Sequence, residues 1–314
     1  MSRLGRASVC LTLCGGVVLL GFSCGWVKAA EPTGEPAPIT PIPPPPPIDP
    51  RVIALGQTLF NDPGLSGDGK RACSSCHDVN TNGADGKRVD AGPTGVNLAF
   101  NTTTLFNAGL AYRLGWRGDA TSLEALAARS LSNPNVMDSS PSHVLEAISG
   151  STALRQQFQA IYHRSVDFPL VLTVIASYER SLVTPGSRFD LWLQGDKAAL
   201  SPEALQGYHL FTSFGCVSCH QGVDVGANLF EPSGVYHPIE GNLRPVLLVP
   251  SLRNVAVTAP YFHDGSVATL EAAVALMGKA QLDRPLTIEQ IKEIAAFLRS
   301  LTGRYQGRLL TQAR

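Results

Sequence analysis

The feature that most constrains this chain is a pair of Cys-x-x-Cys-His motifs, at Cys73–His77 and Cys216–His220. In such a motif the two thiols form thioether bonds to a porphyrin, and the adjacent histidine becomes an axial ligand of the iron. Two disulfides or a paired-cysteine zinc site would also use four cysteines, but neither requires a histidine after each pair. The motifs therefore predict two covalently bound haem c groups, with His77 and His220 as proximal iron ligands. The attaching cysteines are Cys73, Cys76, Cys216 and Cys219.

The first 30 residues have the pattern of a secretory signal peptide. Two arginines lie in the first six residues, an apolar run follows over residues 9–22, and small residues lie around Ala30. Because the run is too short to span a bilayer comfortably, we expect a cleaved signal peptide at residues 1–30 and a periplasmic protein. Processing as a lipoprotein at Cys24 is the alternative. The cysteines before residue 30 are removed with the leader, so every cysteine of the mature chain belongs to a haem motif.

A proline-rich segment at residues 31–51 separates this leader from the rest of the chain. It includes the unbroken run Pro43–Pro47. Such a composition favours an extended polyproline conformation without internal hydrogen bonds. We therefore predict a linker that contributes nothing to a core.

Length and charge narrow the organisation and the partners. A chain of 314 residues exceeds the usual size of one domain, which favours two. Lysine plus arginine and aspartate plus glutamate number 25 each. A chain without net charge offers no electrostatic reason to expect nucleic acid or an anionic membrane as a partner.

The two halves of the chain repeat one another. Thr104–Asn107 parallels Ser251–Asn254, and Leu123–Ala125 parallels Leu270–Ala272, with a common offset of 254 − 107 = 147 residues. Gly56 and Gly207 precede the two haem motifs in similar helical stretches, and the second of these helices has a start signal at Ser201–Glu203. A similar amphipathic pattern closes each half, at residues 175–182 and 294–301.

This repetition predicts the fold. Helical patterns dominate both halves, and glycine- and proline-rich loops lie between them. We predict a mainly α-helical protein of two cytochrome c-like haem domains related by internal duplication. The N-terminal haem domain is expected at residues 52–190 and the C-terminal haem domain at residues 191–314.

The repeat also allows the two iron faces to be compared. Met277 follows the start of a second-half helix, where its thioether can reach the second iron, and its counterpart in the first half is Ser130. A sixth protein ligand favours electron transfer, whereas an open face allows small-molecule chemistry. Met137 is the rival ligand for the first iron, although methionine is more often a core residue. We therefore predict one catalytic haem, at His77, and one electron-supplying haem.

Trp116 occupies the position that His263 holds in the second half. An indole can relay an electron between separated centres, and the alternative is an aromatic side chain that packs against haem. Trp116 is therefore our candidate catalytic residue beside His77. For His263 the sequence leaves open a contact with a haem propionate or a hydrogen bond in the core.

From about Arg51 onward the chain resembles the bacterial di-haem cytochrome c peroxidase and MauG family. The resemblance rests on the two haem motifs and on two further segments, Tyr178–Pro185 and Val249–Gly265. It implies an N-terminal haem that meets peroxide and a C-terminal haem of high potential ligated by Met277. It also implies that Trp116 lies between the haems.

The resemblance implies a calcium ion as well. Its ligands would be Asn101 and the backbone carbonyls of Thr258 and Pro260, since hard oxygen atoms suit this ion. A homodimer is implied by the same family analogy.

Two departures from the family pattern concern the first haem. The histidine that caps this haem in many members has no counterpart in the loop of residues 89–101, which implies an open iron face. The family acid near this haem is replaced by Val136, within Asn133–Met137. Because general acid–base help is worth about 10²–10⁴-fold in rate, this departure implies less efficient peroxide turnover than in the family.

Three functions remain open on the sequence. The leading hypothesis is a periplasmic peroxidase that reduces hydrogen peroxide with electrons from a small redox protein, a cytochrome c or a cupredoxin. The second is MauG-like, peroxide-dependent oxidation of a side chain on a partner protein. The third is a non-enzymatic di-haem electron carrier.

Overall fold

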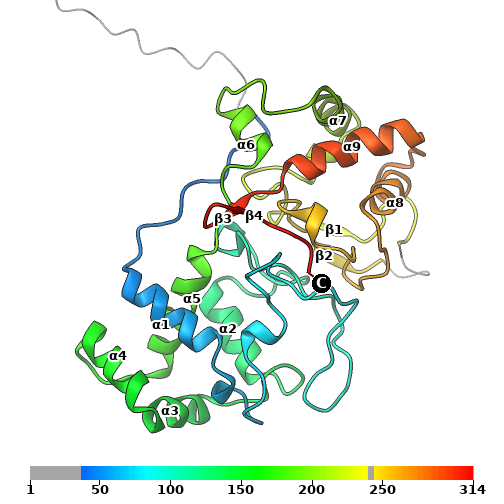
Figure 1. Ribbon diagram of the computed structural model, residues 1–314. Coiled ribbons are helices and arrows are strands. Elements are labelled where there is room, and N and C mark those ends of the chain that lie inside the picture. The colour runs from blue at the N-terminus through cyan, green and yellow to red at the C-terminus, as the bar shows by residue number, and fades with distance from the viewer. Residues whose placement is uncertain (1–36, 240–243, 314) are drawn as a thin grey trace, which may run out of the picture. The chain divides into compact units, whose positions relative to one another are not determined.

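Two helix pairs of the same design organise the chain, whose computed structural model describes residues 37–239 and 244–313 (Figure 1). Helix α1 (Pro50–Phe60) packs against α5 (Phe168–Ser181), and α7 (Pro202–Ser213) packs against α9 (Ile288–Ser300). Each pair joins the helix before a haem motif to the last helix of its half. The expected signal peptide and residues 31–36 of the expected linker lie outside the described residues.

The remaining elements are short. The other α-helices are α2 (Leu123–Ser132), α3 (Pro141–Gly150), α4 (Thr152–Tyr162), α6 (Arg188–Leu193) and α8 (Leu270–Leu282). Single 3₁₀ turns are η1 (Pro63–Leu65), η2 (Cys73–Ser75), η3 (Ala108–Leu110), η4 (Cys216–Ser218) and η5 (Val255–Val257). Two antiparallel ribbons join β1 (Phe230–Pro232) to β2 (Val246–Leu248) and β3 (Arg304–Tyr305) to β4 (Arg308–Leu309), with Phe230 opposite Leu248 and Arg304 opposite Leu309. The prediction of a mainly α-helical chain is confirmed.

Side-chain caps explain where the long helices begin. Before α7, Ser201 accepts a hydrogen bond from the backbone N–H of Ala204, and Pro202 occupies the first turn, as the start signal predicted. Asp167 caps α5 in the same way. Thr287 and Gln290 form a reciprocal capping box at the start of α9.

A glycine lies at the closest point of each helix pair. A Cβ atom on Gly56 would lie 2.6 Å from the Cβ of Tyr178, and one on Gly207 would overlap the carbonyl oxygen of Glu293 and approach the Cβ of Phe297 at 3.0 Å. Only a residue without a side chain allows such a close approach. This contact explains why both haem motifs follow a glycine-containing helix.

Structural features recur at the 147-residue offset that was seen in the sequence. Helix α2 begins at Leu123 and α8 at Leu270, which differ by 270 − 123 = 147 residues. The turns η3 and η5 are related by this offset. Asn107 and Asn254, which precede them, both adopt left-handed backbone angles, with φ of 66° and 62°. Isolated bridges pair Leu114 with Ala120 and Tyr261 with Val267, again at corresponding positions.

The two halves have separate apolar clusters. In the first half, α1 to α5 enclose a cluster that includes Phe158 and Val171, which are fully buried. In the second, α6 to α9 enclose a cluster built around Phe189 and Phe297. Both clusters lie within one compact unit, residues 37–314. A division into two domains near residue 190 stays a prediction.

A buried polar network connects the halves. Thr184 donates its N–H to Asn107 Oδ1 at 2.9 Å, while Gly303 donates its N–H to Asn254 Oδ1 at 2.9 Å. The Thr184 hydroxyl accepts from the amides of both asparagines, at 2.9 Å and 3.0 Å. Asn107, Thr184 and Asn254 are at most 1% exposed. Because buried polar groups are costly when unpaired, this network favours a single relative arrangement of these segments.

The proline-rich segment differs from the expected linker. Ile39 and Ile42 are only 1% and 3% exposed, and Ile39 belongs to the apolar cluster of the second half. Pro38 accepts a hydrogen bond from the N–H of Gly222 at 2.7 Å. The expectation that residues 31–51 contribute nothing to a core is therefore wrong for residues 37–42, because two isoleucines between the prolines supply apolar side chains.

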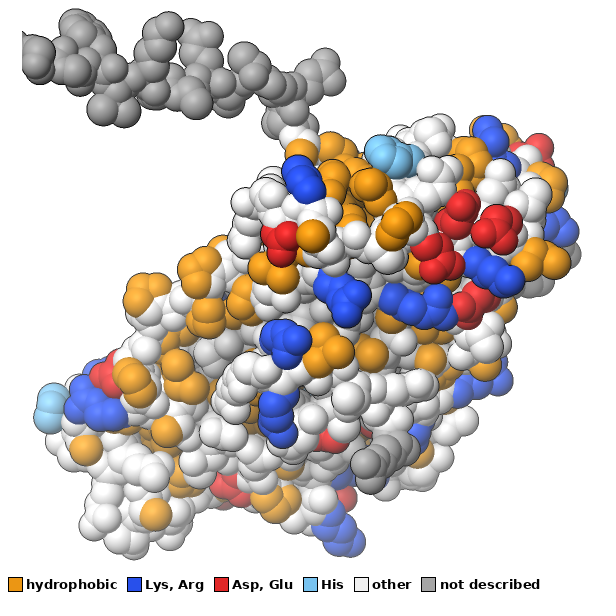
Figure 2. All heavy atoms as spheres, turned by 45° about the horizontal axis from the view of Figure 1, so that its top comes forward, with side chains coloured by type: hydrophobic (Ala, Val, Ile, Leu, Met, Phe, Trp, Pro, Cys, Tyr) orange, Lys and Arg blue, Asp and Glu red, His pale blue; other side chains and the backbone are white. Residues whose placement is uncertain are grey.

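Lysine, arginine, aspartate and glutamate side chains are interspersed over the face in Figure 2. Within residues 37–239 and 244–313, the helices are all too short or too polar to span a bilayer.

The close crossing of α7 and α9 can be tested with Gly207→Ala. We expect this added methyl group to force the helices apart and to lower the free energy of unfolding by about 1–3 kcal/mol. Gly150→Ala, at the exposed end of α3 with no heavy atom within 4 Å of the new methyl group, is the control and should change it little. Thermal unfolding of the two holoproteins checks this, and equal stabilities would contradict the crossing.

Candidate functional site

Each haem motif folds into a single 3₁₀ turn. In the first, the Ser75 hydroxyl accepts from the N–H of Ala72 at 3.0 Å, and the N–H of His77 donates to the carbonyl of Cys73 at 3.1 Å. In the second, the N–H of His220 donates to the carbonyl of Cys216 at 3.0 Å. These tight turns place both sulfur atoms and the imidazole of a motif on one short segment. All four cysteines are free thiols and half-buried.

The two histidines are oriented by backbone carbonyls. His77 Nδ1 lies 3.1 Å from the oxygen of Gly83, and His220 Nδ1 lies 3.3 Å from the oxygen of Val225. Because a carbonyl only accepts, Nδ1 carries the proton in both rings, and Nε2 is left as the metal ligand. Burial lowers the pKa of both imidazoles, that of His220 to about 4. Both rings are therefore neutral at pH 7, as iron ligation requires.

This donor set fits covalently attached haem. It combines two thiols and one oriented, neutral imidazole in each half, and the thiols are not paired with each other. Among the described residues, histidine, cysteine, aspartate and glutamate form no group of three that could hold a metal ion by themselves. The alternatives of disulfides and a zinc site are thus not supported by the geometry.

A buried ion pair holds the loop that orients His220. Arg253 Nη1 lies 2.8 Å from Asp190 Oδ1, and both side chains are at most 1% exposed. The same guanidinium donates to the carbonyls of Val223 and Thr40 at 2.8 Å and 2.7 Å. Sequence reasoning missed this pair. The one indication in the sequence was that Arg253 lies within residues 249–265, a segment that resembles the family.

In the first half, Asn82 holds the corresponding loop. Its Oδ1 accepts from the N–H of Ala84 at 2.9 Å, and its amide donates to the carbonyl of Val257 at 2.5 Å. Val257 belongs to η5, so the loop after the first haem motif is bound to the second half. Sequence reasoning also missed Asn82.

Trp116 lies where the two halves meet. Its indole N–H donates to the carbonyl of Asn101 at 2.9 Å, and Asn101 donates its backbone N–H to the carbonyl of His263 at 2.7 Å. The rings of Trp116 and His263 meet edge to face, with centroids 6.1 Å apart. Two residues at corresponding positions of the sequence repeat are thus in contact, one from each half.

Asn101 lies near the loop that carries the other candidate calcium ligands. Its side-chain amide donates to the carbonyls of Lys87 and Arg88 at 2.7 Å and 3.1 Å. Its backbone N–H donates to the carbonyl of His263, which follows Thr258 and Pro260 in the same segment. The three candidate ligands therefore belong to two connected loops.

The methionines lie in different environments. Met277 is half-buried on α8, and its counterpart Ser130 is half-buried on α2. Met137 is 5% exposed and belongs to the first-half apolar cluster with Leu55 and Leu65. Val136 packs against that cluster. Met137 is thus a core side chain in this structure.

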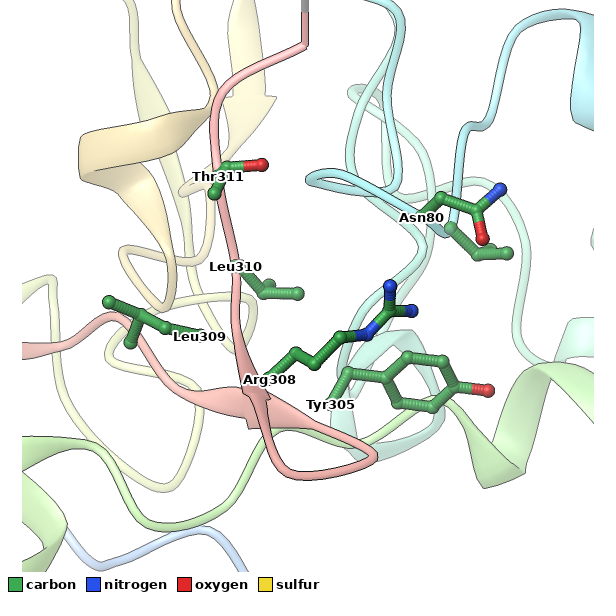
Figure 3. A pocket seen from close by; sticks show the side chains of 7 residues that line it. Asn80, Tyr305, Arg308, Leu309, Leu310 and Thr311 are labelled. Carbon is green, nitrogen blue, oxygen red and sulfur yellow. The ribbon is translucent and has the colours of Figure 1, made fainter.

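The C-terminal hairpin closes over the segment that follows His77. Figure 3 shows a pocket between this segment and the hairpin, with Arg308 and Tyr305 facing Asn80. Tyr305 also packs on Phe106 at a centroid distance of 5.1 Å. Leu310 belongs to the apolar cluster against which Cys73 packs. The end of the chain therefore covers part of the first haem-attachment region.

Comparisons with known proteins agree with this architecture. The family described as di-haem cytochrome c peroxidase matches residues 50–198. A cytochrome c551 peroxidase of Nitrosomonas europaea is 38% identical, covering 90% of this chain and 87% of that protein. A cytochrome c peroxidase of Escherichia coli is 36% identical, covering 85% of this chain and 62% of that protein. The crystal structure of a MauG-like protein associated with microbial copper homeostasis superposes with a TM-score of 0.73 at 27% identity, covering 83% of this chain and 93% of that one.

The buried ion pair gives a test of how the second haem region is held. Asp190→Asn leaves the Arg253 charge buried without its partner, which should lower the free energy of unfolding by about 3–5 kcal/mol. Chemical denaturation followed by haem absorption measures this. Arg51→Gln, which removes an exposed ion pair with Asp49, is the control and should change the stability little, because solvent screens exposed charges. Similar losses in both variants would contradict a structural role for the buried pair.

Proposed function

Because this chain belongs to the di-haem cytochrome c peroxidase family, we propose that it reduces hydrogen peroxide at a haem attached beside His77, with electrons that enter through a haem attached beside His220. The observation that carries this assignment of roles is an asymmetry between the halves. Met277 on α8 can supply a sixth ligand to the second iron, whereas the corresponding residue on α2 is Ser130, which cannot. An open face is needed for peroxide, and a closed one suits electron transfer.

The protein contributes orientation and electrostatics to this chemistry. When bound, haem c supplies an iron that exchanges electrons and, where one face is open, binds peroxide. Gly83 and Val225 hold His77 and His220 with Nε2 free for that iron. The loop of residues 89–101 has no histidine to close the first site.

Trp116 is proposed as the electron relay between the two sites. Support comes from its position at the contact between the halves, with His263 against its ring and the Asn101 carbonyl on its indole N–H. That hydrogen bond fixes the plane of the indole. A fixed aromatic ring between two redox centres shortens the steps that an electron has to make.

We further propose that the two halves are cytochrome c-like domains that arose by internal duplication, with a boundary near residue 190. Support for a duplication comes from elements that share one sequence offset. These are the turns η3 and η5, the helices α2 and α8, and the isolated bridges. The two glycine crossings support it as well, because each lies at the same place in its helix pair.

One calcium ion is proposed in the region between the halves. Asn101 would provide its side-chain oxygen, and Thr258 and Pro260 their backbone carbonyls. The Asn101 amide nitrogen donates to Lys87 and Arg88, which leaves Oδ1 as the atom available to a cation. Such an ion would stiffen the segment that also holds Trp116.

The signal-peptide pattern of residues 1–30 supports an exported protein. We propose a periplasmic protein that receives electrons from a cytochrome c or a cupredoxin. A homodimer is proposed by analogy with the family.

MauG-like oxidation of a side chain on a partner protein is the second candidate. It is favoured by the likeness to the MauG-like protein of known structure and by Val136 in place of the acid of the peroxidases. A mass increase or a new cross-link in an exported partner after peroxide treatment would support it over peroxide turnover with a small electron donor.

The open first site predicts the spectrum of the oxidised protein. We expect one high-spin and one low-spin haem by EPR, and loss of the high-spin signal when peroxide is added. Met277→Ala should convert the second haem to a high-spin form as well. Two low-spin haems that do not respond to peroxide would contradict the assignment of an open site to His77.

The relay predicts a specific effect of Trp116→Phe. Steady-state peroxide reduction with a reduced donor protein should slow by at least about tenfold, equivalent to about 1.4 kcal/mol of barrier. Trp192→Phe removes an indole that stacks on Phe189 in the second-half core and should not affect the rate. Equal rates for the wild type and Trp116→Phe would rule out this relay.

A further inference from the structure

Glu179 is a buried acid whose carboxylate is incompletely paired. It lies on α5, is 8% exposed, and its Oε2 has no hydrogen-bond partner among the described residues. Glutamate is rarely buried without a partner, because an unpaired buried polar group costs free energy. Such a group in a native protein calls for a reason other than stability.

The second half shows that the fold does not need this acid. The repeated segments at residues 175–182 and 294–301 align Glu179 with Leu298, a buried core residue of α9. The preceding pair, Tyr178 and Phe297, packs in the same way against Gly56 and Gly207. A leucine therefore suffices at this position of the helix pair, and the acid is specific to the half with the open site.

The acid interacts with the haem-attachment turn. Tyr178, the residue before Glu179, belongs to the apolar cluster against which Cys73 packs. Burial and, to a smaller extent, the charge of Glu179 raise the pKa of the Cys73 thiol. In the mature protein this sulfur carries the porphyrin. The carboxyl group of Glu179 thus lies within electrostatic range of the first haem site.

The charged groups around Glu179 do not provide a counter-ion. Arg180 is the adjacent cation, but its guanidinium donates twice to Glu124 of α2, at 2.6 Å and 2.8 Å. The electrostatic partners of Glu179 are Arg180, Glu124, Tyr178 and Cys73. The other ionisable residues of α1, α2 and α3, which also pack against α5, are Arg51, Arg129, His143 and Glu146, and none of these shifts the pKa of Glu179. Burial raises the pKa of Glu179 to about 8, so the group is protonated at neutral pH.

We propose that Glu179 holds and delivers a proton at the first haem site. It would thereby take the role of the family acid that Val136 replaces in this chain. Reduction of one peroxide molecule to two water molecules consumes two electrons and two protons. Glu179 supplies one of these protons, becomes a carboxylate, and is reprotonated from solvent. Around and above pH 8, where Glu179 is ionised, it also takes up a proton when an electron reaches the first haem, because added negative charge nearby favours the neutral acid. This inference rests on the proposed peroxidase function.

The first test measures the potential of each haem in the holoprotein as a function of pH, without peroxide. For the wild type we expect the potential of the first haem to fall as pH rises around pH 8, with a slope approaching one proton per electron. Glu179→Gln should abolish that slope, and the second haem should be unaffected. The control Glu146→Gln, an exposed acid of α3, should retain it. A slope that persists in Glu179→Gln overturns the proposal.

The second test keeps the proposal falsifiable if glutamine disturbs folding. Glu179→Leu copies the residue of the second half. Proton binding by Glu179 stabilises the folded state fully at pH values below the pKa that this group has in the unfolded chain. That stabilisation is lost as the pH rises from there to about 8, the pKa in the folded state. The unfolding midpoint of the wild type should therefore fall over this range more than that of Glu179→Leu. Parallel curves would mean that Glu179 does not hold a proton.

The third test separates this inference from the peroxidase function itself. Peroxide reduction by the wild type should decline above pH 8, while Glu179→Gln should be slower by about 10²-fold and independent of pH there. If the variant is slow but keeps the wild-type pH profile, Glu179 has a structural role and the proposal fails. If the wild type does not reduce peroxide, the proposed function fails, yet the pH dependence of the potentials still decides whether Glu179 exchanges a proton.

Discussion

The hydrogen-bonded group of Asn107, Thr184 and Asn254 is the interaction on which the rest of the structure depends. Each asparagine precedes the 3₁₀ turn of its own half, and both share the same threonine hydroxyl. A network of this kind tolerates little sliding, because each displacement leaves a buried polar atom unpaired. The halves are therefore held in one register, and Trp116 and His263 meet as a consequence. Electron transfer between two sites requires this kind of fixed separation.

The difference between the halves is chemical rather than architectural. Both orient their histidine through a backbone carbonyl, and both cross their helices at a glycine. They diverge at a few side chains: Ser130 against Met277, Glu179 against Leu298, and Trp116 against His263. Under the proposed roles, these few differences make one site suited to substrate and the other suited to electron transfer. The proposed proton supply and the proposed open face then belong to the same half.

Features carried by short segments were predictable from the sequence. The haem motifs, the helix start at Ser201 and the mainly helical character depend on local residue patterns. The ion pair of Arg253 with Asp190 was not predictable, since the partners are 63 residues apart and neither belongs to a motif for ion pairing. The burial of Ile39 was missed because composition describes the average of a segment, and a few apolar side chains decide where it packs. Glu179 was passed over because an acid in an amphipathic helix is usually solvated, and only tertiary structure reveals its burial.

The contacts of residues 37–42 make the second half discontinuous in sequence. These residues precede the whole first half, yet Ile39 packs in the second-half cluster and the carbonyl of Thr40 binds Arg253, 213 residues away. The core of the second half is thus completed by a segment that precedes the first half in the sequence. Closing such a long loop carries an entropic cost that is recovered only when both ends are in place. The two haem regions are consequently coupled in assembly, and formation of the first half brings the missing piece of the second into reach.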